Sequence, residues 1–536
     1  MSEDRNDPET GAAAPRRRGW ARAACGALSG VIAGFCALAF AELVAAVVRP
    51  EAGPVTAVGG AVIDRTPPAL KDFAVRNFGT NDKLVLELGI LALLTLFAVA
   101  VGLLALRHRL PGAAAVLVFG AVGAAAAIGR PEGRVSDALP SVLGAVVAAG
   151  VLYLLAGRLS PATASSPGRA AAGAFDRRGF VIAASAAAAA SAGAGLLGRQ
   201  LTSAVQAGAA ASRRDLVLPV PDSPAPAVPA GADLEIRGLG PFVTPNKDFY
   251  RIDTALVVPR LDAGEWRLRI HGTGVARPVT LSFRDLLRRE IVERDITLTC
   301  VSNEVGGPYV GNARWIGVRL ADLLREAGVR PPSEGGRADQ IVARSVDGMT
   351  IGTPVEDVMD GRDALLALGM NGEPLPFEHG FPVRMVVPGL YGYVSACKWI
   401  KDIELTTFDA YDAYWVRRSW SPRAPIKTQS RIDTPRPFSS PKAGTVPVAG
   451  VAWAQHRGIT RVEVRVDDGP WHPARLAAQD GRDTWRQWVW EWPATPGSHT
   501  LEVRATDRTG AVQTGRRVGT VPDGATGRHT VVVDVT

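Results

Sequence analysis

Five long apolar segments in the first 200 residues constrain the fold more than any other feature of the chain. They cover approximately residues 21–48, 84–106, 112–129, 139–157 and 179–198. A helix of about 20 apolar residues is long enough to cross the hydrocarbon core of a bilayer. After about residue 200 the composition becomes that of an ordinary soluble protein. We therefore predict a multi-domain chain, in which residues 1–199 form a membrane region with five transmembrane helices.

Basic residues at the ends of these segments indicate the orientation of the helices. They precede the first segment, join the second to the third, and join the fourth to the fifth: Arg16, Arg17, Arg18, Arg107, Arg109, Arg158, Arg169, Arg177 and Arg178. Basic flanks generally face the cytoplasm, and an odd number of spans then places the rest of the chain on the opposite side. The predicted location is the cell membrane, as a multi-pass protein with extracytoplasmic soluble domains.

The same region lacks the residues that bind haem. His108 is the only histidine before residue 271, and it lies between two segments, so no pair of histidines can hold a haem inside the membrane. The chain has four cysteines (Cys25, Cys36, Cys300 and Cys397) and no Cys-x-x-Cys motif. We therefore expect no haem and no iron–sulfur cluster.

The last apolar segment begins with Arg177-Arg178-Gly179-Phe180 and continues into Ala, Gly and Ser. This pattern resembles a twin-arginine export signal, which carries already folded proteins across the membrane. The alternative is that the two arginines only fix the orientation of the helix.

Two soluble domains follow a linker. Residues 200–232 are rich in Ala, Ser and Pro, which predicts an extended tether. Residues 233–432 mix short alternating strands with brief amphipathic helices, which is typical of an α+β domain. They contain no nucleotide-binding GxGxxG or GxxxxGK motif and no GxSxG motif. The net charge of +8 is not gathered into a basic stripe with aromatic residues, so we expect no nucleic-acid partner.

The strand pattern changes near residue 443. Runs such as 459–466 and 499–505 alternate apolar and polar residues and end at Asp-rich turns. Residues 443–536 are therefore predicted to form an all-β sandwich of immunoglobulin size.

Cys300 is the residue in the soluble part that most suggests chemistry. It ends the β-like run 295–300 and enters a turn that contains Asn303 and glycines. A thiol in this position can face backbone N–H groups, which favour the thiolate that binds soft metals. A lone cysteine is more often a buried packing residue, so its neighbours decide between the two readings.

Several motifs follow one another in the sequence around and after Cys300. They are Leu298-Thr-Cys300-Val-Ser-Asn303, Asn312-Ala-Arg314-Trp315-Ile-Gly317, Met370-Asn-Gly-Glu-Pro-Leu-Pro376, His379-Gly-Phe-Pro-Val-Arg384 and Lys398-Trp399-Ile400. Together, in this order, they resemble the sulfite oxidase family of molybdenum enzymes. The resemblance covers about residues 235–430, and residues 443–536 look like the dimerisation domain of the family. It implies a sulfite-oxidase-type molybdopterin-binding domain and an immunoglobulin-like domain that forms a homodimer.

The resemblance also implies a cofactor and its ligands. A mononuclear molybdopterin would receive Cys300 as the protein ligand of the metal. Residues in matching motifs would contact the pterin or its phosphate: Asn246, Tyr250, Arg251, Asn303, Ser345, His379, Arg384, Ser395 and Lys398. Arginine suits a phosphate because its planar fork donates two charge-assisted hydrogen bonds. Tyr414 is expected to line the substrate pocket as a catalytic residue. Asp253 stands where many family members have a histidine.

The function implied is two-electron oxygen-atom transfer on a small molecule. Sulfite is a dianion, yet Asn303 is followed by Glu304, where animal and plant members have arginine. Reduction of sulfoxides, including methionine sulfoxide, therefore stays open, as does a catalytically silent, membrane-anchored scaffold. Electrons would pass to a separate carrier, either a soluble cytochrome or a membrane quinone, and lipid would surround the helices.

Overall fold

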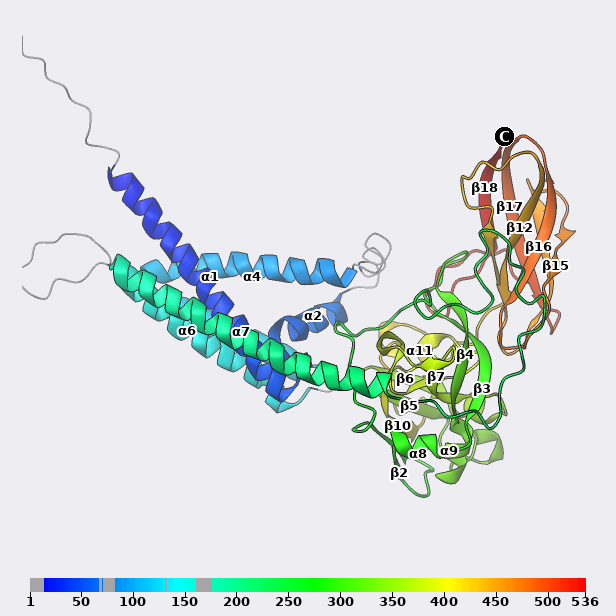
Figure 1. Cartoon of the computed structure of the whole chain (residues 1–536), viewed down its shortest axis with the longest axis horizontal. Coiled ribbons are helices and arrows are strands. Elements are labelled where there is room, and N and C mark those ends of the chain that lie inside the picture. The colour runs from blue at the N-terminus through cyan, green and yellow to red at the C-terminus, as the bar shows by residue number, and fades with distance from the viewer. Residues whose placement is uncertain (1–13, 67–69, 71–81, 131–132, 161–175) are drawn as a thin grey trace, which may run out of the picture. The chain divides into compact units, whose positions relative to one another are not determined.

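The computed structural model describes residues 14–66, 70, 82–130, 133–160 and 176–536 (Figure 1). The chain divides into two compact units, which are described one at a time. The first comprises Met1–Ala207 with Ala255–Val257, and the second comprises Gly208–Thr254 with Val258–Thr536.

The first unit is helical. Its elements are α1 (Ala14–Val48), η1 (Pro50–Ala52), α2 (Pro54–Arg65), α4 (Asp82–Arg107), α5 (Arg109–Ile128), η3 (Val135–Ala138), α6 (Leu139–Leu159) and the greater part of α7 (Arg177–Arg214). Five of the described helices, namely α1, α4, α5, α6 and α7, are long and apolar enough to cross a membrane. The prediction of five long apolar helices is therefore confirmed. Arg169 and the side chains of Arg16, Arg17 and Arg18 lie outside what the structure describes.

Small residues allow close contact between the helices of this unit. A Cβ on Gly30 of α1 would lie 1.9 Å from the carbonyl oxygen of Ala98 on α4, so only glycine fits there. Close approach through small residues is a common basis of helix association in membranes. Ala33, Val101, Ala148 and Leu152 form a buried cluster that joins α1, α4 and α6.

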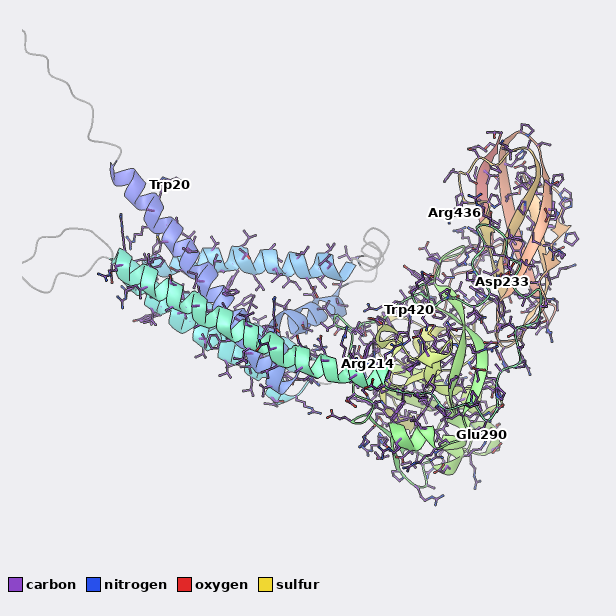
Figure 2. The ribbon with its side chains drawn as sticks, in the orientation of Figure 1. Trp20, Arg214, Asp233, Glu290, Trp420 and Arg436 are labelled. Atoms are coloured by element: carbon purple, nitrogen blue, oxygen red, sulfur yellow. The ribbon has the colours of Figure 1, made fainter. Side chains whose placement is uncertain are left out.

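Helix α7 is longer than predicted. It continues to Arg214 (labelled in Figure 2), so the prediction of an extended tether is wrong for residues 200–214. These residues are mostly Ala, Gln, Ser and Leu, and alanine has the highest helix propensity. The prolines of the predicted linker all fall at or after Pro219, where the helix has ended. The extended part is bound to the second unit, because Ser223 forms a parallel bridge with Val292.

The first domain of the second unit contains two sheets joined by short helices. The strands of one sheet run in the order β2-β1-β10-β5-β6, with β1 (Arg267–Gly272) parallel to β10 (Ile400–Thr406) and the other pairs antiparallel. The other sheet has the order β3-β4-β7-β8, with β9 also beside β7. The remaining bounds are β2 (Val279–Ser282), β3 (Val292–Thr299), β4 (Val310–Arg319), β5 (Gln340–Ser345), β6 (Thr350–Pro354), β7 (Leu365–Met370), β8 (Glu373–Pro374) and β9 (Arg384–Val386). The helices are α8 (Phe283–Leu287), α9 (Leu320–Glu326), η4 (Pro332–Glu334), α10 (Val355–Met359), η5 (Phe377–His379), α11 (Gly392–Ser395) and η6 (Val416–Arg418).

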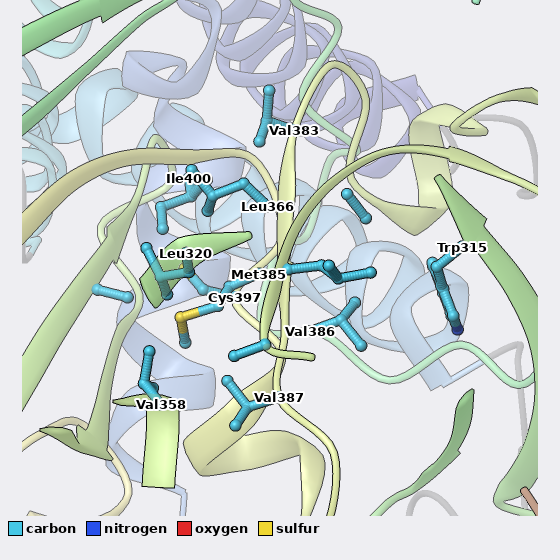
Figure 3. Packing of buried hydrophobic residues seen from close by; sticks show 14 of the residues in the cluster. Trp315, Leu320, Val358, Leu366, Val383, Met385, Val386, Val387, Cys397 and Ile400 are labelled. Carbon is cyan, nitrogen blue, oxygen red and sulfur yellow. The ribbon is translucent and has the colours of Figure 1, made fainter. Parts of the chain in front are cut away.

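A single apolar core supports both sheets of this domain (Figure 3). Cys397 belongs to it, and its backbone carbonyl accepts a hydrogen bond from the N–H of Met385 at 2.8 Å. Trp315 of β4 is fully buried, and its indole N–H donates to the carbonyl of Ile296 at 3.0 Å. This core fixes the strand ends from which the polar site residues project.

The C-terminal domain is a sandwich of two antiparallel sheets around one core. One sheet has the order β11-β12-β16-β15 and the other β14-β13-β17-β18. Their bounds are β11 (Gln429–Thr434), β12 (Gly444–Trp453), β13 (Ile459–Val466), β14 (His472–Pro473), β15 (Arg475–Leu476), β16 (Arg486–Ala494), β17 (Gly497–Asp507) and β18 (His529–Val535). Strand β11 lies before the predicted boundary, but Ile432 packs in the sandwich core, so the sandwich begins about 14 residues earlier than residue 443.

The sandwich also completes the edge of β3, the strand that leads to Cys300. The backbone N–H of Thr297 donates to the carbonyl of Asp483 at 2.9 Å, and the N–H of Trp485 donates to Thr297 Oγ1 at 2.7 Å. The side-chain amide of Gln455 donates to the carbonyl of Thr297 at 2.9 Å and to Thr299 Oγ1 at 3.2 Å. An edge strand that would expose its hydrogen-bonding groups is thus covered.

Candidate active site

A cavity lies beside Cys300 in the second unit. Its lining comes from six segments that are far apart in the sequence: 249–254, 300–302, 345–351, 379–384, 392–399 and 415–420. Tyr250, Cys300, Ser345, His379, Arg384 and Lys398, all predicted as site residues, line this cavity. The fold therefore brings six predicted residues to one place.

Cys300 follows the last residue of β3 and is 8% exposed. Its backbone N–H donates to the carbonyl of Tyr309 at 3.0 Å, which closes the loop after the strand. Burial raises the pKa of the Cys300 thiol, while hydrogen bonds from the backbone and side chain of Ser302 and the charge of Lys398 lower it. The predicted backbone donor is present, but burial outweighs it, so the thiolate requires further positive charge nearby.

Arg384 is a buried cation at the start of β9. Its side chain is 4% exposed, and its guanidinium lies 5.0 Å above the ring of Trp315. One nitrogen, Nη1, donates to the carbonyl of His379 at 3.2 Å, whereas Nε has no hydrogen-bond partner. Burial lowers the pKa of Arg384 to about 10, so the group stays charged at neutral pH. Among the described residues no carboxylate forms an ion pair with it.

Lys398 lies in the same cavity and is held by a buried carboxylate. Its Nζ donates to Asp253 Oδ2 at 3.0 Å and to the carbonyl of Glu378 at 3.0 Å. Asp253 is 4% exposed and also accepts a hydrogen bond from Arg251 Nε at 2.9 Å. Burial lowers the pKa of Lys398 to about 8, although the charge of Asp253 opposes this. Asp253, noted in the sequence only as a departure from the family, therefore joins Lys398 to Arg251. Arg251 itself does not line the cavity.

His379 is oriented by the segment around Asn246. Its Nε2 lies 3.1 Å from the carbonyl oxygen of Asn246, and its ring meets that of Phe249 edge-on at 5.5 Å. Burial, together with the charges of Arg384 and Lys398, lowers the pKa of His379 to about 4, so the ring is neutral. A neutral imidazole whose Nε2 donates has Nδ1 as an acceptor. The side chain of Asn246 donates to Met370 and Glu373 and does not line the cavity.

Two other predicted residues support the loops around the cavity instead of lining it. Asn303 Oδ1 accepts a hydrogen bond from the N–H of Tyr309 at 2.7 Å, which fixes the loop after Cys300. Ser395 is fully buried, and its hydroxyl donates to the carbonyls of Leu390 and Tyr391. The polar side-chain groups of Asn303 and Ser395 are thus hydrogen-bonded to the backbone of the protein itself.

Tyr414 does not have the position that was expected of it. Its ring packs against Trp415 and lies 3.5 Å from the guanidinium carbon of Arg418, and it does not line the cavity. One wall of the cavity is instead formed by Tyr393, Trp415 and Trp420. These aromatic residues stand outside the motifs that identify the site, and only the proximity of Trp415 to Tyr414 in the sequence pointed to them.

Glu304 is exposed and lies outside the cavity lining. The carboxylate that seemed to oppose an anionic substrate is therefore not a wall of the site. Arg314 does not line the cavity either, because it pairs with Asp295 at 2.6 Å.

The residues of the cavity fit a molybdopterin. A buried guanidinium with an unpaired Nε is costly unless an anion accompanies it. A phosphate beside Arg384 and Lys398 would supply that anion, and Nδ1 of His379 and the buried hydroxyl of Ser345 offer polar contacts to a heterocycle. Cys300, on the same cavity, would supply a thiolate to the metal.

Gly380 permits the close packing of the two cationic residues. Its φ is +110°, and a Cβ there would lie 3.1 Å from the Cβ atoms of Arg384 and Lys398. We expect Gly380→Ala to lower the pterin content of the purified protein severalfold, because the methyl group strains the backbone and displaces both cations. Gly361→Ala is the matched control, since Gly361 has a φ of +97° with open space around it. Equal pterin content in both variants would contradict the assignment.

The low pKa of His379 predicts a pH dependence of stability. A histidine whose folded pKa lies below its unfolded value of about 6.5 stabilises the folded state above that pH. This contribution, about 1–3 kcal/mol, is lost as the pH falls toward 4. The thermal unfolding temperature of the cofactor-free protein in detergent should therefore fall more steeply between pH 6.5 and pH 4 than that of the cofactor-free His379→Gln variant. Parallel pH profiles for the two proteins would refute this.

Comparisons with known proteins agree with this site. Residues 255–415 match the model of the oxidoreductase molybdopterin binding domain. The mitochondrial sulfite oxidase of Homo sapiens is 30% identical over 306 residues, which cover 49% of this chain and 55% of that protein. An uncharacterized oxidoreductase of Bacillus subtilis, YuiH, is 34% identical over 162 residues, which cover 30% of this chain and 75% of that protein. The crystal structure of the sulfane dehydrogenase SoxCD from Paracoccus pantotrophus gives a TM-score of 0.47 at 26% identity, covering 55% of this chain and 83% of that one.

The chain spans about half the length of the sulfite oxidases that it matches. The range matched by the family model, residues 255–415, contains Cys300, His379, Arg384 and Lys398. The chain therefore belongs to the sulfite oxidase family and contains an oxidoreductase molybdopterin-binding domain.

Proposed function

We propose that this protein is a membrane-anchored enzyme that transfers an oxygen atom, with two electrons, at a molybdenum site outside the cytoplasm. One observation carries the proposal. The same cavity contains the Cys300 thiol and the buried guanidinium of Arg384, which has no carboxylate partner among the described residues. When bound, the cofactor supplies two-electron oxygen-atom transfer.

The side chains of the cavity have separate tasks in this proposal. Cys300 holds the metal, and Arg384 and Lys398 hold the phosphate. Asp253 keeps Lys398 in position through the 3.0 Å ion pair. His379 stays neutral and accepts a hydrogen bond at Nδ1, so it orients the heterocycle without adding charge.

Sulfite is the first substrate to test, because several of the matching proteins are named sulfite oxidases. Its oxidation takes one oxygen from water and yields sulfate, two protons and two electrons. The exposed position of Glu304 removes the repulsion that the sequence suggested.

A specific observation supports a second candidate, the reduction of a neutral sulfoxide. The wall of Tyr393, Trp415 and Trp420 has no basic side chain, and the basic residues of the cavity, His379, Arg384 and Lys398, belong to the cofactor side. Aromatic rings accommodate a neutral organosulfur group, whereas a dianion needs cations.

The location rests on the five apolar helices and on the flanking arginines. Arg177 and Arg178 are exposed at the start of α7, where an export machinery would reach them. Export of a folded protein suits a cofactor that is inserted in the cytoplasm. We also propose that the C-terminal sandwich is immunoglobulin-like and forms a homodimer, because residues 443–536 resemble the dimerisation domain of the family.

Metal analysis and a substrate screen test the proposal together. We expect the purified full-length protein to contain about one molybdenum and one pterin per chain. It should oxidise sulfite with an artificial dye acceptor, or reduce a sulfoxide with a reduced dye. Metal and pterin without turnover on any sulfite, sulfoxide or N-oxide would refute the proposed chemistry. The lack of both metal and pterin would instead favour a silent scaffold.

A further inference from the structure

An apolar cavity lies inside the first unit, between α1, α2, α4, α5 and α6. Its volume is about 290 Å³. An apolar cavity of about 150 Å³ is enough to bind benzene, so this one has room for a larger ring. The helices approach closely at Gly30 and Gly102, yet they leave this space where Gly34, Leu94 and Val116 face it.

The lining contains one polar group that calls for a ligand. Among the lining residues that the structure describes, only Thr95 and Ser141 carry hydroxyls, and Thr95 Oγ1 already donates to the carbonyl of Leu91 at 2.8 Å. Ser141 of α6 is 5% exposed, and its Oγ has no hydrogen-bond partner. This Oγ lies beside Gly123 of α5, so it reaches an acceptor in the cavity only after the side chain rotates about its Cα–Cβ bond. A buried hydroxyl without a partner costs free energy, so such a rotation toward an acceptor would stabilise the bundle.

Aromatic rings border the same cavity. Phe97 of α4 and Phe119 of α5 are stacked, with their ring centroids 4.6 Å apart, and both line it. Such a pair offers a flat apolar surface against which a further ring can pack. The cavity thus combines a planar apolar wall with a single hydrogen-bond donor.

We propose that this cavity binds the head ring of a lipid-soluble quinone, with Ser141 Oγ donating to one carbonyl of the ring. A quinone has a flat apolar ring and hydrogen-bond acceptors, which are the two properties that the lining matches. A phospholipid acyl chain would fill the space but would leave Ser141 without an acceptor.

This inference rests on the proposed function and deepens it by naming the electron partner. Sulfite oxidation releases two electrons, and reduction of a quinone to the quinol takes up two electrons and two protons, so one turnover of each balances. Sulfoxide reduction would run the exchange in the other direction, with the quinol as donor. Among the described residues of the first unit, His108 is the only histidine, and it lies between α4 and α5, so no pair of histidines there could hold a haem that relays electrons.

The binding test uses full-length protein in nanodiscs of synthetic phospholipid without quinone. Titration with decylubiquinone, followed calorimetrically, should show one saturable site per chain. Ser141→Ala should weaken binding about five- to tenfold through loss of one hydrogen bond. Gly34→Leu should abolish binding, because the leucine side chain would fill the cavity. Its Cβ would fit without a clash, since that position lies 3.4 Å from the Cβ of Ala98.

Gly150→Leu is the matched control, because Gly150 is exposed on α6 with nothing within 4 Å of its Cβ position. It should bind the quinone as the unaltered protein does. No saturable binding, or equal affinity in Gly34→Leu and Gly150→Leu, would overturn the proposal in favour of a lipid-filled cavity.

Turnover separates this inference from the proposed function. With an artificial dye, all three variants should match the unaltered protein, whereas with decylubiquinone Ser141→Ala and Gly34→Leu should lose activity in step with binding. Quinone binding without any dye-linked turnover would refute the enzyme and leave the site. Dye-linked turnover without quinone binding would refute the site and leave the enzyme.

Discussion

Replacement of Cys300 by serine will reduce turnover by about 10³-fold or more, while most of the pterin remains bound. The hydroxyl is nearly the size of the thiol but is a hard, weakly acidic ligand, so it is a poor substitute for a thiolate on molybdenum. The loop around Cys300 is held by Asn303 and Tyr309 through contacts that serine does not disturb. Dye-linked turnover measures the loss of activity, molybdenum content measures retention of the cofactor, and the electron paramagnetic resonance of the reduced metal reports the change of ligand.

Cys397→Ala is the control for this experiment. Cys397 is buried in the apolar core of this domain (Figure 3), where its carbonyl is bonded to the N–H of Met385, and burial raises the pKa of its thiol. Its loss should cost about 1 kcal/mol of stability and leave the metal signal unchanged. A fully active Cys300→Ser protein, or an equal loss of signal in Cys397→Ala, would contradict the role of Cys300.

Arg384→Met will have opposite effects on the cofactor-bound and cofactor-free proteins. The bound cofactor loses its charge-assisted hydrogen bonds, so pterin content should fall below roughly a tenth of the normal value. Without cofactor, the same change removes a buried cation that has no acidic partner among the described residues, and an apolar side chain in its place should raise stability by about 1–4 kcal/mol. Pterin fluorescence and thermal unfolding of both forms measure these effects.

Arg314→Met separates this mechanism from a general effect of losing an arginine. Arg314 pairs with Asp295 and lies outside the cavity, so its loss should lower stability and leave pterin content unchanged. Arg384→Lys tests the geometry, because it keeps the charge but loses the planar fork. If Arg384→Met destabilised the cofactor-free protein, the guanidinium would have a structural partner and its assignment to the phosphate would fail.

The sequence predicted the parts of the site that depend on short local patterns. Cys300 was placed by a strand that runs directly into a Gly- and Asn-rich turn, and the structure ends β3 at the preceding residue. His379 and Arg384 are five residues apart around one turn, so their proximity follows from the chain itself. The five apolar helices were recognisable because each segment alone meets the length and hydropathy that a membrane span requires.

Contacts between distant segments were beyond the sequence. Asp253 and Lys398 are 145 residues apart, and nothing in either neighbourhood indicates their ion pair. Tyr414 was predicted to line the cavity, but the adjacent Trp415 lines it instead. The sequence of a loop does not show which of two neighbouring side chains faces a cavity. The length of α7 was underestimated because Ala, Ser and Pro were taken together, whereas alanine favours a helix and, of these three residue types, only proline strongly disrupts one.

The hydrogen bonds between β3 and the C-terminal sandwich also set an order of events during synthesis. Thr297, three residues before Cys300, is held by Gln455, Asp483 and Trp485, which the ribosome adds more than 150 residues later. At roughly 5–20 residues per second, this interval lasts about 10–40 s. The ribosome adds Arg177 and Arg178, at the start of α7, before this interval even begins. The pocket therefore becomes able to accept its cofactor only when almost the whole chain exists, and a nascent protein would present its proposed export signal well before it is ready to be exported.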